Sequence, residues 1–200
     1  MGVNSKMKEK KKNKKNLSKV IFPGSGIPSC PAQVIIQYWI QGPSTLLSTL
    51  SSPGNFDTKT ITPSLSTLIQ ATSIKAQYDE WRLIAIHFEL MALADTVGAY
   101  KAVIDDEDTT DATQNWANSR IGRVLSLSNK AKTGHCIMKY RSEAIDDLKW
   151  LSTNTQSSSA DCALKLYTSN TQYNTPVSTT GILSVSWKGL FQFRGLGANS

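Results

Sequence analysis

Lysine side chains crowd the first twenty residues and are the clearest sign of chemistry in the sequence. They are Lys6, Lys8, Lys10, Lys11, Lys12, Lys14, Lys15 and Lys19. Glu9 is the only acidic residue among them, so this segment alone carries a net charge of +7. It has few apolar residues to bury, which predicts a disordered polycation that binds the phosphates of nucleic acid. Lysine rather than arginine favours charge neutralisation over recognition of particular bases.

The rest of the chain is electrically neutral. Its 180 residues carry 14 basic and 14 acidic side chains, and 40% of the whole sequence is hydrophobic. A lysine run can also be a solubilising segment or a nuclear-import signal. A neutral globule behind it, with no nucleic-acid fold of its own, favours nucleic-acid binding.

Acidic side chains gather at a second place, where five of the seven residues from 105 to 111 are Asp or Glu. Asp106, Asp108 and Asp111 are spaced so that one turn could direct their oxygen atoms at Ca²⁺. The glycine and the final glutamate of an EF-hand loop are missing. The alternative, which the residues alone favour, is a solvated loop in which Asp111 caps a helix that starts at Ala112.

No pattern of residues indicates catalysis, and we expect no enzymatic activity. The sequence has no G-x-S-x-G, P-loop or H-E-x-x-H motif. His135 and Cys136 are adjacent, but neighbouring residues of a strand point to opposite faces. Three distant cysteines and two histidines indicate neither a disulfide framework nor a zinc site. We interpret His87 as a surface or interface residue, and the five tryptophans as residues of the core or of subunit contacts.

Alternating apolar and polar residues predict an all-β fold. We expect eight strands, at residues 33–41, 58–62, 81–91, 99–104, 124–127, 135–140, 163–167 and 183–194. Gly189 interrupts the apolar face of the last strand, which indicates a bulge or a close approach. Short helices are expected at residues 64–71, 112–118 and 142–151. The spacers are long and contain no Asn-Gly or Asp-Gly turn, which favours a jelly-roll sandwich over a chain of tight hairpins.

Composition divides the chain into three parts. Residues 1–20 form the basic tail, residues 21–32 form an extended arm rich in proline and glycine, and residues 33–200 form the jelly-roll domain. No run of apolar residues is long enough to span a bilayer, and no apolar segment follows the lysines as in a secretory signal. We therefore expect neither a membrane protein nor an exported one.

The order of several short motifs resembles the shell domain of coat proteins from small icosahedral plus-strand RNA viruses of the tombusvirus and sobemovirus type. The motifs are Ile61-Thr62-Pro63, Leu68 and Ala71, Tyr78-Asp79-Glu80-Trp81-Arg82, Gly98 before Ala99 to Ile104, the acidic Asp106-x-Asp108-x-x-Asp111, and Gly181 to Trp187. The resemblance covers about residues 32–194 and implies an eight-stranded jelly roll that closes a shell around the genome. It also implies Ca²⁺ between subunits, held by Asp106, Asp108 and Asp111.

The sequence therefore predicts a capsid protein that self-assembles into an icosahedral shell and packages single-stranded RNA through its basic tail. Its partners are then copies of itself and the viral RNA, with no membrane and no small-molecule substrate. It is expected in the virion, assembled in the host cytoplasm. A DNA genome remains open. The alternatives are a nucleic-acid-binding protein that forms no shell, such as a silencing suppressor or movement-type protein, and a carbohydrate-binding sandwich.

Overall fold

The computed structural model describes most of the chain after residue 34. The described residues are 35–48, 56–68, 70–106, 110–145, 148–154, 160, 162–178 and 180–195. All of them belong to the second of the two units into which the chain divides, residues 33–200. The predicted tail and arm lie outside the described residues.

The first of two antiparallel sheets, sheet A, has the strand order β1-β10-β4-β7. These strands are β1 (Ile36–Gln41), β10 (Leu183–Arg194), β4 (Glu80–Ala92) and β7 (His135–Arg141). The short β2 (Thr45–Leu47) pairs with the first residues of β10, beyond the end of β1. The two-residue β8 (Leu151–Ser152) pairs with the start of β4.

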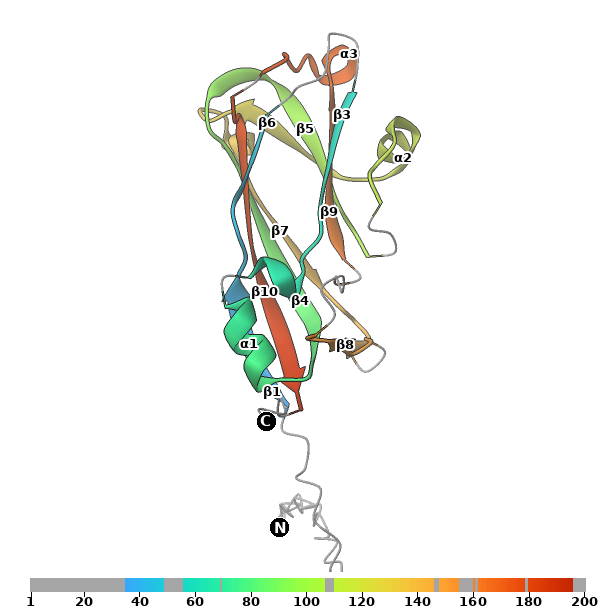
Figure 1. Ribbon diagram of the computed structural model, residues 1–200. Helices are drawn as coiled ribbons and strands as arrows, with labels where there is room; N and C mark the ends of the chain where they lie inside the picture. The colour runs from blue at the N-terminus through green and yellow to red at the C-terminus, as the bar shows by residue number, and fades with distance from the viewer. Residues whose placement is uncertain are drawn as a thin grey trace, which may run out of the picture. The chain divides into compact units, whose positions relative to one another are not determined.

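The second sheet, sheet B, has the strand order β3-β9-β5-β6. Its strands are β3 (Phe56–Ile61), β9 (Ala163–Ser169), β5 (Asp95–Asp105) and β6 (Arg123–Ser128). The chain passes repeatedly between the sheets, so strands that are neighbours in space are often distant in sequence (Figure 1). If β1 and β2 are taken as one interrupted strand and the two-residue β8 is set aside, the described residues form the eight expected strands in jelly-roll order, and the predicted fold class is confirmed.

The alternation of residues along β10 shows why the two sheets pack face to face. Leu183, Val185, Phe191 and Phe193 are fully buried, while the polar residues between them face away from the core. Phe88 of β4 and Leu164 of β9, a strand buried along its whole length, are among the residues that complete the core. The burial of these apolar faces is the main stabilising contribution to such a sandwich.

Gly189 confirms the prediction of an irregular, closely packed position. The pairing of β10 with β4 shifts register between Leu190 and Phe191, directly after this glycine. A Cβ atom at Gly189 would lie 2.6 Å from the Phe191 ring and 2.8 Å from a methyl carbon of Leu83. The close approach of these core side chains explains why no side chain is present here.

The helices were predicted less well than the strands. Residues 64–71 form a short 3₁₀ helix, η1 (Leu65–Thr67), and the α-helix α1 (Ala71–Gln77) begins where the expected helix should end. The helix α2 (Gln114–Ser119) matches the one expected at 112–118, whereas α3 (Asn170–Tyr173) was not expected.

The helix expected at 142–151 is wrong for the described residues of that segment. They contain only an isolated 3₁₀ turn, and the segment ends in β8. The physical reason is Arg82, which reaches across from β4 and donates hydrogen bonds to the backbone oxygens of Ile145 and Leu148. The segment also ends in the pairing of β8 with β4, so Ile145, Leu148 and Leu151 have backbone hydrogen-bond partners outside a helix.

We expect Gly189→Ala to lower the free energy of unfolding by about 1–3 kcal/mol, because the new methyl group would overpack the core between Phe191 and Leu83. Urea denaturation followed by tryptophan fluorescence measures this change. Gly181→Ala is the control, since its Cβ would lie 3.3 Å from the nearest atom of Leu46 on an exposed turn. Equal stability of the two variants would contradict this account of Gly189.

Candidate functional site

The acidic segment begins where β5 ends and leads to α2. Asp106 follows β5 and is exposed, and Asp111 is exposed three residues before α2. Asp108 lies outside the described residues. Among the residues that the structure describes, no three acidic, histidine or cysteine side chains are close enough to hold a metal ion. The calcium site therefore stays a prediction.

The structure gives Asp106 a partner that the sequence did not indicate. Its carboxylate accepts a hydrogen bond from the hydroxyl of Tyr140 on β7, and burial together with this negative charge raises the pKa of Tyr140 to about 12. Cys162 lies nearby, and burial, followed by the charges of Asp106 and Asp105, raises its thiol pKa to about 12. This thiol is therefore protonated and unreactive at neutral pH.

A buried ion pair joins the start of the acidic segment to sheet B. The ammonium of Lys165 on β9 lies 3.0 Å from the carboxylate of Asp105, and the two side chains are only 1% and 5% exposed. The same ammonium lies 4.8 Å from the ring centroid of Trp116 on α2. The Lys101 ammonium donates to the backbone oxygen of Ala117, so two lysines of sheet B hold α2 over the outer face of that sheet.

The cap of α2 differs from the one considered for it in the sequence. The hydroxyl of Thr113, not the carboxylate of Asp111, accepts the hydrogen bond from the backbone N–H of Trp116. The helix begins at Gln114, so Asp111 is too far upstream to cap it. Asp111 is thereby left exposed to solvent at the surface.

Apolar side chains are exposed at the end of the sandwich where β4 turns into β5. They are Leu46, Leu93, Val97 and Val177, with Leu46 67% and Val97 65% exposed. Backbone hydrogen bonds from Leu93 to Ile182 and from Ile182 to Leu47 join the segments that carry Leu46 and Leu93. We call this group of four residues the apolar end. Exposed apolar side chains of this kind are available for contact with another protein.

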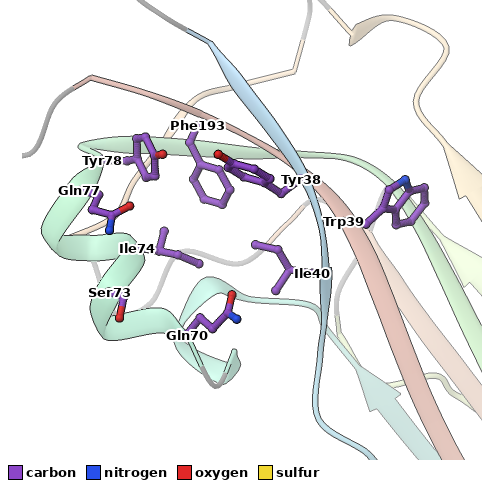
Figure 2. Close-up of a pocket in the computed structure, with 9 residues that line it drawn as sticks. All are labelled: Tyr38, Trp39, Ile40, Gln70, Ser73, Ile74, Gln77, Tyr78 and Phe193. Atoms are coloured by element: carbon purple, nitrogen blue, oxygen red, sulfur yellow. The ribbon is translucent and has the colours of Figure 1, made fainter.

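A groove of about 420 Å³ separates β1 from α1 (Figure 2). Tyr38 and Ile40 of β1 face Ile74 of α1 across it, and Tyr78 stacks on Phe193 with ring centroids 5.2 Å apart. None of the described residues that line the groove is charged. It therefore offers no ligand set for a metal ion and no positive charge for an anion.

His135 and Cys136 point to opposite faces of β7, as predicted. His135 is exposed and its Nε2 lies 2.8 Å from a carboxylate oxygen of Glu89, whereas Cys136 packs against the core. The eight lysines of the tail lie outside the described residues, so the structure does not test them. Trp81 and Trp187 are core residues as expected, but Trp39 is 48% exposed, which the sequence pattern did not distinguish.

The fold is similar to solved structures of virus capsids. Cocksfoot mottle virus matches with a TM-score of 0.57 and 11% identity, over 97% of each chain. Tobacco necrosis virus matches with a TM-score of 0.55 and 9% identity, over 80% of this chain and 97% of its own. A 60-mer of the BFDV capsid protein matches with a TM-score of 0.56 and 12% identity, over 84% of this chain and 97% of its own.

At these identities the similarity establishes the fold alone. It confirms at that level the expected resemblance to the shell domain of virus coat proteins. The sequence matches no protein-family model and no curated protein. Within the described residues, no helix is long and apolar enough to cross a membrane.

We expect Lys165→Met to lower the free energy of unfolding by about 3 kcal/mol, because it leaves the charge of Asp105 buried without its cation. The double variant Asp105→Leu with Lys165→Met should recover much of that loss, since no charge then remains to be solvated. Urea denaturation measures both. Lys130→Met, which removes an exposed partner of Asp95, is the control and should change little. If Lys165→Met were as stable as Lys130→Met, the buried ion pair would not have the stabilising role given to it here.

Proposed function

We propose that this protein is a viral capsid protein whose jelly-roll domain assembles into a closed shell and whose basic tail packages single-stranded RNA. The observation that carries the proposal is the combination of this fold with the distribution of charge. All of the net charge of +7 lies in residues 1–20, and the remaining 180 residues are neutral. A neutral domain can pack against copies of itself without charge repulsion, while the tail neutralises the RNA inside.

Three observations support the self-assembly of the domain. Its fold is shared with virus capsids, one of which forms a 60-mer. The apolar end offers side chains that would lose contact with water if a second copy covered them. Finally, the 180 residues after the tail carry 14 basic and 14 acidic side chains, so copies of the domain repel one another little.

RNA packaging through the tail rests on charge. A tail that neutralises about seven phosphates of a single strand gives a slope of about −5 in a plot of log affinity against log salt concentration. Many tails tethered to one shell act together, so the packaged RNA is held far more strongly than by one tail. In this proposal the protein is located in the virion and assembles in the host cytoplasm.

Deletion of residues 1–20 tests the two parts of the proposal separately. We expect the shortened protein still to form shells under electron microscopy, because residues 1–20 are rich in lysine and have few apolar side chains to bury between copies. The shells should contain much less nucleic acid, measured by the ratio of absorbance at 260 and 280 nm. The control replaces the eight lysines by arginine, which preserves the charge and should preserve packaging.

Two results would contradict this proposal. A full-length protein that stays a single subunit at every salt concentration, yet loses nucleic acid when the tail is deleted, is a nucleic-acid-binding protein without a shell. Binding of glycans at high salt, with no assembly, would instead indicate a carbohydrate-binding sandwich.

We also propose that Asp106, Asp108 and Asp111 hold Ca²⁺ where subunits meet. The support is the chemistry of three carboxylates within six residues and the exposure of Asp106 and Asp111 at the end of β5. The buried pair of Asp105 and Lys165 anchors the start of this segment, and α2 anchors its end.

If Ca²⁺ is held there, a chelator at raised pH should leave the carboxylates repelling one another and swell the particles. Analytical sedimentation measures this as a lower sedimentation coefficient. Particles of the double variant Asp106→Asn with Asp111→Asn should no longer respond to the chelator. Asp95→Asn, at the opposite end of β5, is the matched control and should respond as the unaltered protein does. Unchanged sedimentation of the unaltered particles in chelator would overturn the calcium proposal.

A further inference from the structure

The outer face of sheet A carries a row of polar and basic side chains across four strands. Gln41 of β1 pairs with Lys188 of β10, Lys188 pairs with His87 of β4, and His87 pairs with Lys139 of β7. Directly paired residues of antiparallel strands project from the same face. Their neighbours Trp187, Phe88 and Met138 point the other way, into the core. The four side chains therefore stand in one line on the surface of the sheet.

Trp39 stands beside this row. It lies two residues before Gln41 on β1, so it projects from the same face. Its ring centroid is 4.7 Å from that of His87, and the Lys188 ammonium lies 5.8 Å from the ring. The indole is thus held in place by its neighbours and is still 48% exposed, unlike the buried indoles of Trp81 and Trp187.

The charge of this surface is positive. Lys188, Lys139 and Arg141 are exposed, and no described acidic side chain forms an ion pair with any of them. Glu89, on the same face of β4, also lines the recess, and one of its carboxylate oxygens lies 2.8 Å from Nε2 of His135. Strands lie about 4.8 Å apart, so the backbones of Lys188 and Lys139 are roughly 10 Å apart with His87 between them.

The space in front of the row is hollowed. A recess of about 310 Å³ is bounded by Gln41, His87, Glu89, Ile137, Lys139 and Lys188, and its volume falls at the lower end of the usual range for ligand pockets. The outer face of sheet B is different, because α2 lies over Lys165 and Tyr173 of α3 packs against Tyr167. On the outer face of sheet A, Ile145 and Leu148 cover Ala85 and Leu190, but the neighbouring row that contains Lys188 and Lys139 is exposed.

We propose that this surface, formed by Trp39, Gln41, His87, Lys139 and Lys188, binds single-stranded nucleic acid. One base stacks on the exposed face of Trp39 at the edge strand β1, and the strand then crosses the sheet so that successive phosphates lie against Lys188 and Lys139. An aromatic platform next to cations is the combination with which proteins hold single strands without reading their sequence. The inference deepens the proposed packaging function and rests on it: the tail gathers the polymer and this surface holds it against the domain.

The same observations disfavour a protein partner at this position. Lysine is depleted in the contacts between proteins, and two exposed lysines at the centre of a contact between copies would have to be stripped of water. Ile137 is 47% exposed and also lines the recess, but the more exposed apolar side chains, Leu46 and Val97, belong to the apolar end, on other parts of the structure. The phosphates of a nucleic acid can pair with both lysines, and one of its bases can stack on Trp39.

The first experiment measures binding of a fluorescein-labelled oligouridylate to full-length protein by anisotropy over a series of salt concentrations. Lys139→Gln with Lys188→Gln should reduce the magnitude of the salt slope by about 1.4, because each lost phosphate contact of a single strand contributes about 0.7. The matched control is Lys59→Gln with Lys132→Gln, two exposed lysines on other parts of the domain, which should leave the slope unchanged. Circular dichroism melts show whether each variant remains folded.

The second experiment tests the stacking of a base on Trp39. It is done at high salt, where the lysines contribute little to the binding affinity. Trp39→Ala should weaken binding about tenfold, which corresponds to a loss of about 1.4 kcal/mol, and Trp39→Phe should retain most of the affinity. Ultraviolet crosslinking to the same oligonucleotide should label the peptide that contains Trp39.

The outcomes distinguish this inference from the proposed function. Particles that package nucleic acid normally, with unchanged slope and affinity in all these variants, would overturn the inference and leave the packaging function intact. Variants that bind the oligonucleotide normally but no longer assemble would show that the surface is a contact between copies, which also overturns the inference. A full-length protein that neither assembles nor binds the oligonucleotide would overturn both.

Discussion

The pairing of β10 with β4 is the contact on which the remaining structure depends. The two strands come from opposite halves of the sequence and run together from Leu183 and Ala92 to Arg194 and Glu80. Because side chains alternate along a strand, a slip of one residue would exchange the two faces of the sheet. The register that places Trp187 and Phe88 in the core is therefore the register that places Lys188 and His87 on the surface. Core and surface are two consequences of one set of backbone hydrogen bonds.

Much of the fold could be predicted because the strands are amphipathic and the signal is local. Each of the eight expected strands has a counterpart, and Gly189 was correctly associated with a bulge or a close approach. The short β2 and β8 are too brief to show a period, and both depend on a longer partner strand. The helix expected at 142–151 failed because a distant arginine, Arg82, satisfies the backbone oxygens of that segment.

The candidate sites were less predictable, because they depend on which strands are neighbours. The sequence indicates the acidic segment directly, but it does not show that Tyr140 would donate to Asp106 or that Lys165 would be buried against Asp105. A lysine in the middle of an apolar strand, such as Lys165, is a signal that could have suggested a buried partner. Nothing along the chain brings Trp39, His87 and Lys139 together, since they are adjacent only through the order β1-β10-β4-β7.

The distribution of charge gives the proposed assembly an order of events. In residues 33–200, basic and acidic side chains balance, so copies of the domain repel one another little. The tails carry +7 each, and bringing many of them into one small interior is unfavourable unless a polyanion neutralises them. In the proposed assembly, nucleic acid would remove that repulsion and, bound at the row of Lys188 and Lys139, would also act at the surface of the domain itself. In this scheme the domain supplies the contacts of the shell, and the nucleic acid determines when many copies can close it.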